Sequence, residues 1–276
     1  MVKLTFVGDI LCEQEQLRAC KTIDGTYSFY EGFQGLKEYF SSSDYVIGNL
    51  ETPLAGEELG YTNHMWSFNT PEEFALDLKK SGFHLVTTAN NHCLDRGIEG
   101  LCNTIDVLDK YGIEHIGTYK DEEARNRVFI KEIGEIKIAF IAYTYGTNAS
   151  FNKKYLKRKQ GYYVNMFMPQ EEHIRRRHIV KRALRKFKKV LIKDEVVNFT
   201  TKPYINQLKE DIRKARELGA DYIIMCIDAG GQYNSEPESY TRKLAKYMIE
   251  LGVDTVIGNH EHVVHNGEFI SDKSFI

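Results

Sequence analysis

Small polar clusters that could do metal chemistry recur along the chain, each at the end of a β-type run. They are Gly8-Asp9, Gly48-Asn49-Leu50-Glu51, Asn90-Asn91-His92 with Asp95, Asp228-Ala229-Gly230, and Gly258-Asn259-His260-Glu261-His262. One such cluster is ordinary turn chemistry, but five in succession indicate a shared site. Oxygen ligands and imidazole nitrogens, with no need for a thiolate, suit Mn, Fe, Zn or Mg. A carboxylate able to bridge two cations is what a two-metal hydrolytic site needs.

The elements that must position these clusters alternate between strand and helix. Strands are predicted at 3–7, 45–47, 85–88, 136–143, 222–227 and 253–257, and helices at 71–82, 97–111, 205–218 and 240–251. This alternation predicts an α/β fold with much parallel sheet. Ligands of open α/β sheets bind beyond the carboxyl ends of the strands, which is where the clusters stand.

The composition excludes several classes of protein. The chain has 276 residues, of which 42% are hydrophobic and 28% are charged, which excludes disorder, collagen and coiled coil. The length fits two domain units or one large α/β domain. No apolar run approaches the roughly 18 residues of a membrane span. Met1 leads directly into a strand-like run without a signal-peptide pattern, so the sequence as written is expected to be cytoplasmic. Five scattered cysteines without a CxxC pair predict reduced, mostly buried thiols.

In this order, the motifs resemble the calcineurin-like metallophosphoesterase superfamily and, within it, the CapA-type poly-γ-glutamate capsule biosynthesis family. The resemblance rests on VGD at 7–9, VIGNLETPL at 46–54, TANNHCLDRG at 88–97 and VIGNHEHV at 256–263. It implies one domain over residues 1–276, folded as a four-layer α/β/β/α metallophosphoesterase-like sandwich with a basic insertion at about 147–200. It also implies a cell-surface or membrane-associated location for a protein of this kind.

The resemblance also implies roles for individual residues. One or two divalent metal ions would be held by Asp9, Glu51 as the bridge, Asn91, His260 and His262. His92 would contact or protonate the reacting group during hydrolysis or transfer at a phosphoester. Asp95 has two interpretations, which are a cap for the helix that begins near Gly97 and a carboxylate that orients His92.

The sequence departs from the family pattern in three places. Leu11 stands where many metallophosphoesterases have a histidine, as it does in CapA-like proteins, which removes one nitrogen ligand. Asp228 stands where a histidine is usual, and it would either ligate a harder cation or mark a site without activity. Asn259 and Glu261 stand where the family often has histidine and proline.

Other interpretations of the same residues stay open. Asp9 fits a turn or an N-cap, and Glu51 fits a solvated loop acid. Asn91 and His92 fit packed turn residues, and His260 and His262 fit a surface loop. Apart from His265, the remaining histidines are expected to have surface or packing roles. They are His64, His84, His115, His173 and His178. Cys93 and Cys226 are expected to be buried and inert.

Charge is segregated along the chain, whose net charge is -2. Residues 151–193 hold 15 lysines and arginines against two acids, and the remainder is acidic. A helix beginning near Pro169 is predicted, with an apolar stripe of Val180, Leu184, Phe187 and Leu191. The segment is either a packed insertion helix with a solvated basic face or a contact for an anionic polymer, an anionic membrane surface or the capsule machinery. Nucleic acid is unlikely, because no aromatic-interleaved binding motif accompanies the charge.

Three functions remain open from the sequence. The first is a metal-dependent hydrolase of a phosphoester or a cell-envelope polymer. The second is an accessory protein of capsule assembly that binds metal or polymer without turnover, and the third is a nuclease that uses the basic helix. The family's usual segment after Ser274-Phe275-Ile276 is absent, so either a C-terminally shortened chain or a short family member is expected.

Overall fold

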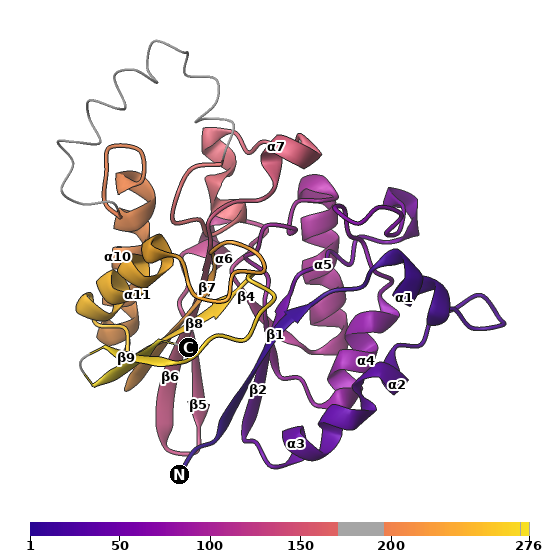
Figure 1. Ribbon diagram of the computed structural model, residues 1–276, viewed down its shortest axis with the longest axis horizontal. Helices are drawn as coiled ribbons and strands as arrows, with labels where there is room; N and C mark the ends of the chain where they lie inside the picture. Colours follow the sequence, from indigo (N-terminus) through magenta and orange to yellow (C-terminus); the bar gives the residue numbers. More distant parts are fainter. Residues whose placement is uncertain (171–195, 271, 276) are drawn as a thin grey trace.

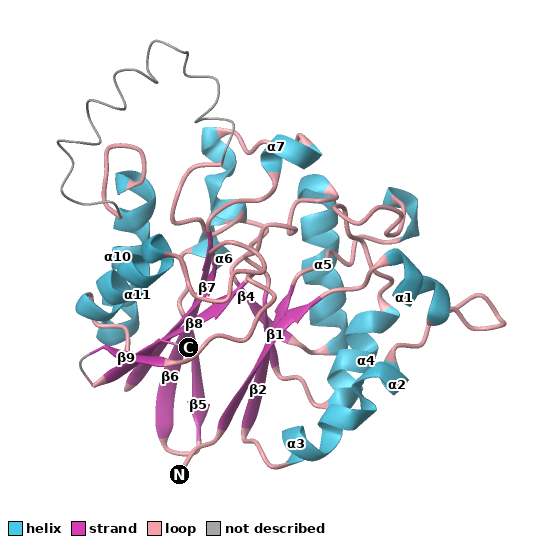
Figure 2. Cartoon of the chain, in the orientation of Figure 1, coloured by secondary structure: helices cyan, strands magenta, loops and turns pink. Residues whose placement is uncertain are grey.

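Two β-sheets stacked between helices form the body of the molecule (Figure 1). The computed structural model describes residues 1–170, 196–270 and 272–275. The first sheet is built from the amino-terminal part of the chain and the second from the rest, and Figure 2 shows the strands of both converging toward the same region. The α/β fold expected from the sequence is confirmed.

The first sheet has four parallel strands in the order β1-β2-β3-β4, which are β1 (Leu4–Ile10), β2 (Tyr45–Leu50), β3 (Leu85–Thr87) and β4 (Glu114–Ile116). Pairing of β1 with β2 shifts register between Val7 and Asp9. The strand therefore passes through Gly8 and ends at Ile10, whereas the sequence predicted its end at residue 7. Asp9 consequently lies within β1, opposite Asn49.

The second sheet has six strands in the order β5-β6-β7-β8-β10-β9. They are β5 (Phe129–Ile133), β6 (Ile136–Thr144), β7 (Tyr222–Asp228), β8 (Thr255–Asn259), β9 (Glu268–Ile270) and β10 (Lys273–Phe275). The four inner strands are parallel, and β5 and β9 pair antiparallel at the two edges. The sequence patterns did not predict β4, β5 or β9, which are short or lie at an edge.

Helices cover the outer face of each sheet. α4 (Glu73–Ser81) and α5 (Gly97–Tyr111) pack on the first sheet, and α10 (Lys202–Glu217) and α11 (Ser239–Glu250) pack on the second. All four agree with the predicted helices to within three residues at each end. The other helices are short, and they are α1 (Gln14–Ala19), α2 (Tyr30–Phe33), α3 (Lys37–Ser41), α6 (Glu122–Arg125) and α7 (Ala149–Asn152), with 3-10 turns at Gln34–Leu36, Glu57–Leu59 and Arg158–Tyr163.

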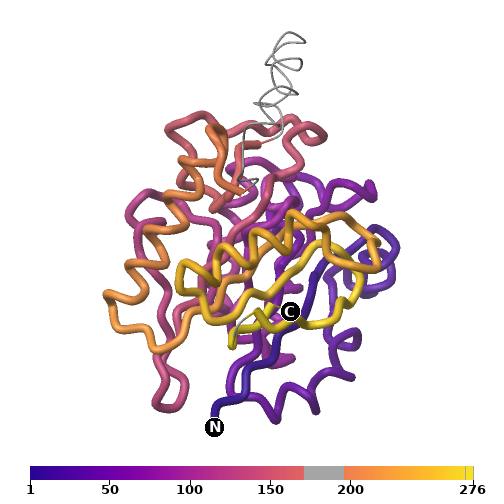
Figure 3. The backbone as a smooth tube through the Cα atoms, turned by 60° about the vertical axis from the view of Figure 1, so that its left-hand side comes forward, coloured from indigo at the N-terminus to yellow at the C-terminus, as the bar shows by residue number. Residues whose placement is uncertain are grey.

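Three of the four apolar clusters of the described residues lie between the layers. One lies between the first sheet and its helices and includes Val46 and Leu78, and another lies between the second sheet and its helices and includes Leu208 and Met225. The third joins the inner faces of the two sheets, where Ile47 and Phe140 are both about fully buried. The expected four-layer order is therefore present. In Figure 3 the yellow carboxyl-terminal part comes forward in front of the purple part.

The expected basic insertion is described only at residues 147–170 and 196–200. Its described part is tied to the body by bridges from Thr118 to Val164 and from Thr144 to Met166. The helix predicted from Pro169, with its apolar stripe, lies outside the described residues apart from its first two positions, as do His173 and His178. Within the described ranges, no helix is long and apolar enough to cross a membrane. One domain with an insertion stays a prediction.

Candidate metal centre

Asp9 and Glu51 come from the ends of the two neighbouring strands β1 and β2. The Asn49 side chain donates a hydrogen bond of 2.7 Å to Asp9 Oδ1, which fixes that carboxylate above the sheet. Glu51 follows β2 directly, and its backbone N–H donates to the Ile10 carbonyl at 2.9 Å. This bond extends the strand pairing by one residue and turns Glu51 into the interior, where it is 0% exposed. Glu51 is therefore not a solvated loop acid.

The turn after β3 is held by its own amides. Asn90 Nδ2 donates to the Leu50 carbonyl at 2.7 Å, and Asn90 Oδ1 accepts from the His92 backbone N–H at 3.2 Å. The Asn91 backbone N–H donates to Asp228 Oδ2 at 3.1 Å. Because Asp228 ends β7, this contact joins the carboxyl ends of the two sheets.

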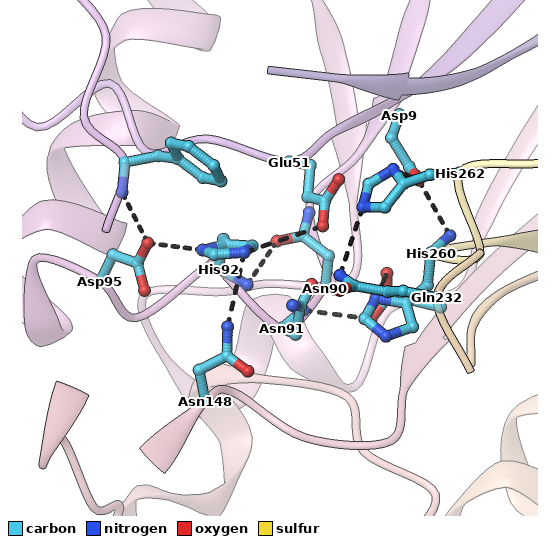
Figure 4. Close-up of polar contacts among 12 residues, drawn as sticks. Asp9, Glu51, Asn90, Asn91, His92, Asp95, Asn148, Gln232, His260 and His262 are labelled. Atoms are coloured by element: carbon cyan, nitrogen blue, oxygen red, sulfur yellow. Dashed lines mark hydrogen bonds and ion pairs between the residues drawn. The ribbon is translucent and has the colours of Figure 1, made fainter. Parts of the chain in front are cut away.

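The second sheet contributes Asp228, His260 and His262. Both histidines follow β8 and have positive φ angles, 94° for His260 and 55° for His262. Residues other than glycine seldom adopt a positive φ, and backbone outliers of this kind cluster at functional sites. The His260 backbone N–H donates to Asp9 Oδ2 at 3.0 Å, and His262 Nδ1 lies 3.3 Å from the same oxygen. The loop thus turns both rings toward the first sheet, with His260 buried and His262 still partly exposed to solvent (Figure 4).

The side chains form two groups that share one carboxylate. Asp9, Glu51 and His262 form the first, and Glu51, Asp228 and His260 form the second. In each group the possible ligand atoms lie within 4.8 Å of one another. A shared carboxylate between two three-residue groups is the arrangement that a pair of divalent ions requires.

Five buried atoms that face this centre lack hydrogen-bond partners among the described residues. They are both carboxylate oxygens of Glu51, Asn91 Oδ1, Asp228 Oδ1 and His260 Nδ1, and all are buried. Buried polar atoms in folded proteins nearly always have a partner. Since carboxylate, amide and imidazole donors suit divalent ions from Mg to Zn, the residues present fit one or two such ions.

The pKa shifts of the site residues also fit a bound cation. Burial, followed by repulsion from Asp9 and Asp228, raises the pKa of Glu51 to about 10. Burial and the charge of Asp9 raise the pKa of Asp228 well above its usual value. Burial also acts to raise the pKa of Asp9, but hydrogen bonds from His262 and Asn49 outweigh it, so that this pKa is lowered. Burial lowers the pKa of His260 to about 4, which keeps the imidazole neutral as a metal ligand must be.

His92 lies beside the centre and is held from behind by Asp95. Asp95 Oδ2 lies 2.7 Å from His92 Nδ1 and accepts from the Phe68 backbone N–H at 2.8 Å. The ring packs against the Phe68 ring, with centroids 4.4 Å apart. His92 Nε2 then faces the centre, 3.9 Å from Glu51 Oε1 (Figure 4). Of the two interpretations of Asp95, the geometry favours the orienting one, since α5 begins after Arg96 without a side-chain cap.

Several neighbours of the site were not among the predicted site residues. Asn148 Nδ2 lies 3.5 Å from His92 Nε2, and Gln232 Nε2 lies 3.3 Å from His262 Nε2. The Thr144 hydroxyl donates to Asp228 Oδ2 at 2.8 Å. No motif signals Asn148 or Thr144, because Thr144 ends β6 and Asn148 precedes α7, and each reaches the site only through the fold.

Among the described residues, the other histidines and the cysteines lie away from the centre or have packing roles. His84 Nδ1 accepts from the Val46 backbone N–H at 3.0 Å, and its ring stacks on Tyr45. His265 Nδ1 lies 2.5 Å from Glu261 Oε2. Cys93 and Cys226 are buried free thiols, as expected, and burial raises the pKa of Cys226 to about 12.

The chain is similar in sequence to known bacterial capsule proteins. A family model for the bacterial capsule synthesis protein PGA_cap matches residues 3–276. The chain is 24% identical to the PGA biosynthesis protein CapA of Bacillus subtilis, over 98% of this chain and 61% of that protein. It is 22% identical to the capsule biosynthesis protein CapA of Bacillus anthracis, over 95% of this chain and 55% of that protein. The chain thus spans less than two thirds of the length of these relatives.

A solved structure is similar in fold. It is a Staphylococcus aureus protein provisionally assigned as a 5′-nucleotidase, in complex with α-ketoglutarate. The TM-score is 0.53 at 17% identity, over 100% of this chain and 48% of that chain. This likeness is one of fold, and it agrees with the metallophosphoesterase-like sandwich expected from the sequence.

Proposed function

The chain belongs to the family of bacterial capsule synthesis proteins PGA_cap, and from this premise we propose that it is a divalent-metal-dependent hydrolase of the phosphoester type in the synthesis of a capsule or cell-envelope polymer. The observation that carries the proposal is Glu51. Its carboxylate is fully buried, has no hydrogen-bond partner among the described residues, and belongs to both ligand groups. A buried carboxylate in that state is stabilised by cations rather than by protein donors.

The proposed ligands divide between two ions. Asp9 and His262 would hold one and Asp228 and His260 the other, with Glu51 between them and Asn91 Oδ1 as a further oxygen donor. Divalent ions in this position supply electrostatic stabilisation of the charge that develops on the phosphoryl oxygens.

His92 is the proposed proton-transfer group. The contact between Nδ1 and Asp95 fixes the orientation of the ring and leaves Nε2 directed at the centre. A phosphoester oxygen bound beside Glu51 would lie within reach of Nε2, which would exchange a proton with it. Phe68 and Asn148 restrict the ring from two further directions.

The test is turnover of phosphomonoesters and phosphodiesters by the protein loaded with Mn, Fe, Zn or Mg. His92→Ala is expected to lower kcat by roughly 10²–10⁴-fold, the range typical of a lost proton-transfer group, while metal content stays unchanged. The matched control is His115→Ala, since His115 lies away from the centre, beside Asp109. Unchanged turnover in His92→Ala would contradict the proposal.

The second candidate function is an accessory protein of capsule assembly that binds metal or polymer without turnover. The favouring observation is Asp228, a carboxylate at the position where the resemblance leads one to expect histidine. One of its oxygens already accepts from Thr144 and from the Asn91 backbone N–H, which leaves a single oxygen for a cation. Bound metal without turnover on any phosphoester, together with salt-sensitive polymer binding, would favour this second function.

A further inference from the structure

The turn from the end of β6 through α7 brings two asparagine side chains to the His92–Asp95 pair. Asn148 Nδ2 lies 3.5 Å from His92 Nε2, and Asn152 Nδ2 lies 3.4 Å from Asp95 Oδ1. Figure 4 shows the amide of Asn148 directed at the imidazole ring of His92. None of the four motifs that carry the family resemblance includes either asparagine.

The turn is anchored at both ends. At its start, the Thr144 hydroxyl donates to Asp228 Oδ2 at 2.8 Å. Near its end, Asn152 Nδ2 donates to the carbonyl of Thr147 at 2.8 Å, and Thr147 itself is only 1% exposed. These bonds fix the chain on either side of Asn148, so that its side chain has a defined position beside His92.

The backbone of Asn148 has a left-handed conformation, with φ 49° and ψ 29°. Asparagine tolerates this region better than most residues. It is also among the best residues for capping a helix, yet its side chain makes no capping hydrogen bond to α7. The amide is therefore directed at His92 instead of at the local backbone.

The hydrogen-bonding roles of the two side chains follow from Asp95. His92 Nδ1 lies 2.7 Å from Asp95 Oδ2, so Nδ1 carries the proton and Nε2 of the neutral ring is an acceptor. A donor is the group that pairs with such a nitrogen, in agreement with the orientation of the Asn148 amide. Once Nε2 carries a proton to transfer, both nitrogens are donors, and both need an oxygen that accepts.

Two donors at this spacing can share one oxygen. Nitrogens 3.5 Å apart both reach an oxygen that lies about 2.9 Å from each of them. Donors that converge in this way stabilise negative charge that develops on the shared oxygen during a reaction.

We propose that Asn148 is a catalytic residue, whose Nδ2 donates a hydrogen bond to the phosphoester oxygen that His92 Nε2 approaches. The inference rests on the proposed function, because that oxygen belongs to the phosphoester at the metal centre. The amide keeps its proton and stabilises the charge on the oxygen, while His92 exchanges a proton with the same oxygen.

The first test is calorimetric titration of the Mn²⁺-loaded protein with orthophosphate, which needs no turnover. Asn148→Gly removes the amide and permits the left-handed backbone, and Asn148→Asp keeps the shape but replaces the donor with a carboxylate. Phosphate binding is expected to weaken by about tenfold in Asn148→Gly, the loss expected for one charged hydrogen bond. It should weaken further in Asn148→Asp, because the carboxylate repels the anion. Mn²⁺ affinity should stay unchanged in Asn148→Gly.

The order of the two variants separates a contact with the anion from a merely structural role. If Asn148 only positioned the His92 ring, Asn148→Asp would keep a polar group beside Nε2 and would be the milder change. Asn206→Asp is the control for the added charge, because Asn206 is exposed on α10 and should bind orthophosphate as the unchanged protein does. A milder Asn148→Asp, equal phosphate binding by all variants, or no phosphate binding by the unchanged protein overturns the inference.

The second test separates Asn148 from the proposed function. With turnover, Asn148→Gly is expected to lower kcat for bis-p-nitrophenyl phosphate by roughly 10²–10³-fold, the range for one lost donor to a developing charge. If the protein turns over no phosphoester while both variants weaken phosphate binding in the expected order, the contact with the anion stands and the hydrolase proposal fails. If turnover occurs and kcat is unchanged in Asn148→Gly, the hydrolase proposal stands and the inference about Asn148 fails.

Discussion

Glu51 is the most completely buried carboxylate of the site. It is fully buried among other carboxylates, and its pKa is raised to about 10 by burial and by Asp9 and Asp228. In the metal-free protein at neutral pH, folding must therefore bind a proton to this carboxylate, and replacing it with an uncharged amide removes that cost. The same replacement would take away a ligand from both proposed ions, so the effects of one substitution have opposite signs in the two states.

Glu51→Gln is therefore expected to leave the unfolding temperature of the metal-free protein unchanged or higher. Saturating Mn²⁺ should stabilise the unchanged protein by about 2.7 kcal/mol at 100 times Kd, and this stabilisation should disappear in Glu51→Gln. Thermal unfolding with and without Mn²⁺ measures both effects. Glu58→Gln, at an exposed position, is the control and should behave as the unchanged protein does. An equal Mn²⁺ response in Glu51→Gln would contradict its role as a ligand.

The raised pKa of Glu51 also predicts a pH dependence. In the metal-free protein the folded state keeps a proton that the unfolded chain releases above its ordinary pKa of 4.5. Stability should therefore fall as pH rises from 7 to 9, by up to about 1.4 kcal/mol per pH unit for such a group. His260, whose pKa is lowered to about 4, adds nothing in this window because it is neutral in both states.

Urea denaturation of the metal-free protein at pH 7, 8 and 9 measures that slope. Glu51→Gln should have a smaller slope, because the amide does not titrate. Added Mn²⁺ should stabilise more at pH 9 than at pH 7, since protons compete with the cation for the carboxylate. Stability that is flat or rises across the window in the metal-free protein would contradict the assignment.

Among the elements, the loop after β8 carries two of the second sheet's three proposed ligands, and it packs against the loop after β7. The loop after β7 carries Gly230, with φ 114°, and the loop after β8 carries Glu261. Glu261 fills the space over Gly230, where an added Cβ would lie 1.8 Å from Glu261 Oε1. The Tyr233 backbone N–H also donates to the Glu261 carbonyl at 2.8 Å, so the two loops are packed as one unit.

Gly230→Ala should displace Glu261 and with it the adjoining His260 and His262. The expected result is a loss of stability of about 1–3 kcal/mol, together with weaker Mn²⁺ binding. Gly252→Ala is the matched control, because Gly252 has a similar φ of 107° but nothing within 4 Å of an added Cβ. It should cost stability through backbone strain and leave Mn²⁺ affinity unchanged. Equal Mn²⁺ affinity in both variants would show that the packing of the two loops does not position the ligands.

Some of these strands and turns could be predicted from the sequence, and others could not. The strand ends that carry Glu51, Asn91 and Asp228 were visible as β-rich runs that stop at polar clusters. The register shift in β1 was not visible, because it depends on pairing with β2 rather than on the residues of β1 alone. Asn148 was not visible either, since a turn 56 positions away in the chain brings it to His92.

For the whole molecule, the site exists only because the two sheets meet at their carboxyl ends. Asp9 and His260 are 251 positions apart, and their hydrogen bond of 3.0 Å joins the first strand of one sheet to the loop after β8 of the other. The apolar core between the sheets fixes that approach before any ligand binds. The family pattern predicted this layered fold, and membership of the PGA_cap family is shown over residues 3–276.

We propose that Glu51 lies between two cations held by residues from both sheets. The most direct measurement is anomalous diffraction from crystals of the Mn²⁺-loaded protein. We expect anomalous density among Asp9, Glu51 and His262 and among Glu51, Asp228 and His260, and none at either place in Glu51→Gln. Crystals of the Mn²⁺-loaded protein with no anomalous density at this centre, or with unchanged density in Glu51→Gln, would contradict it.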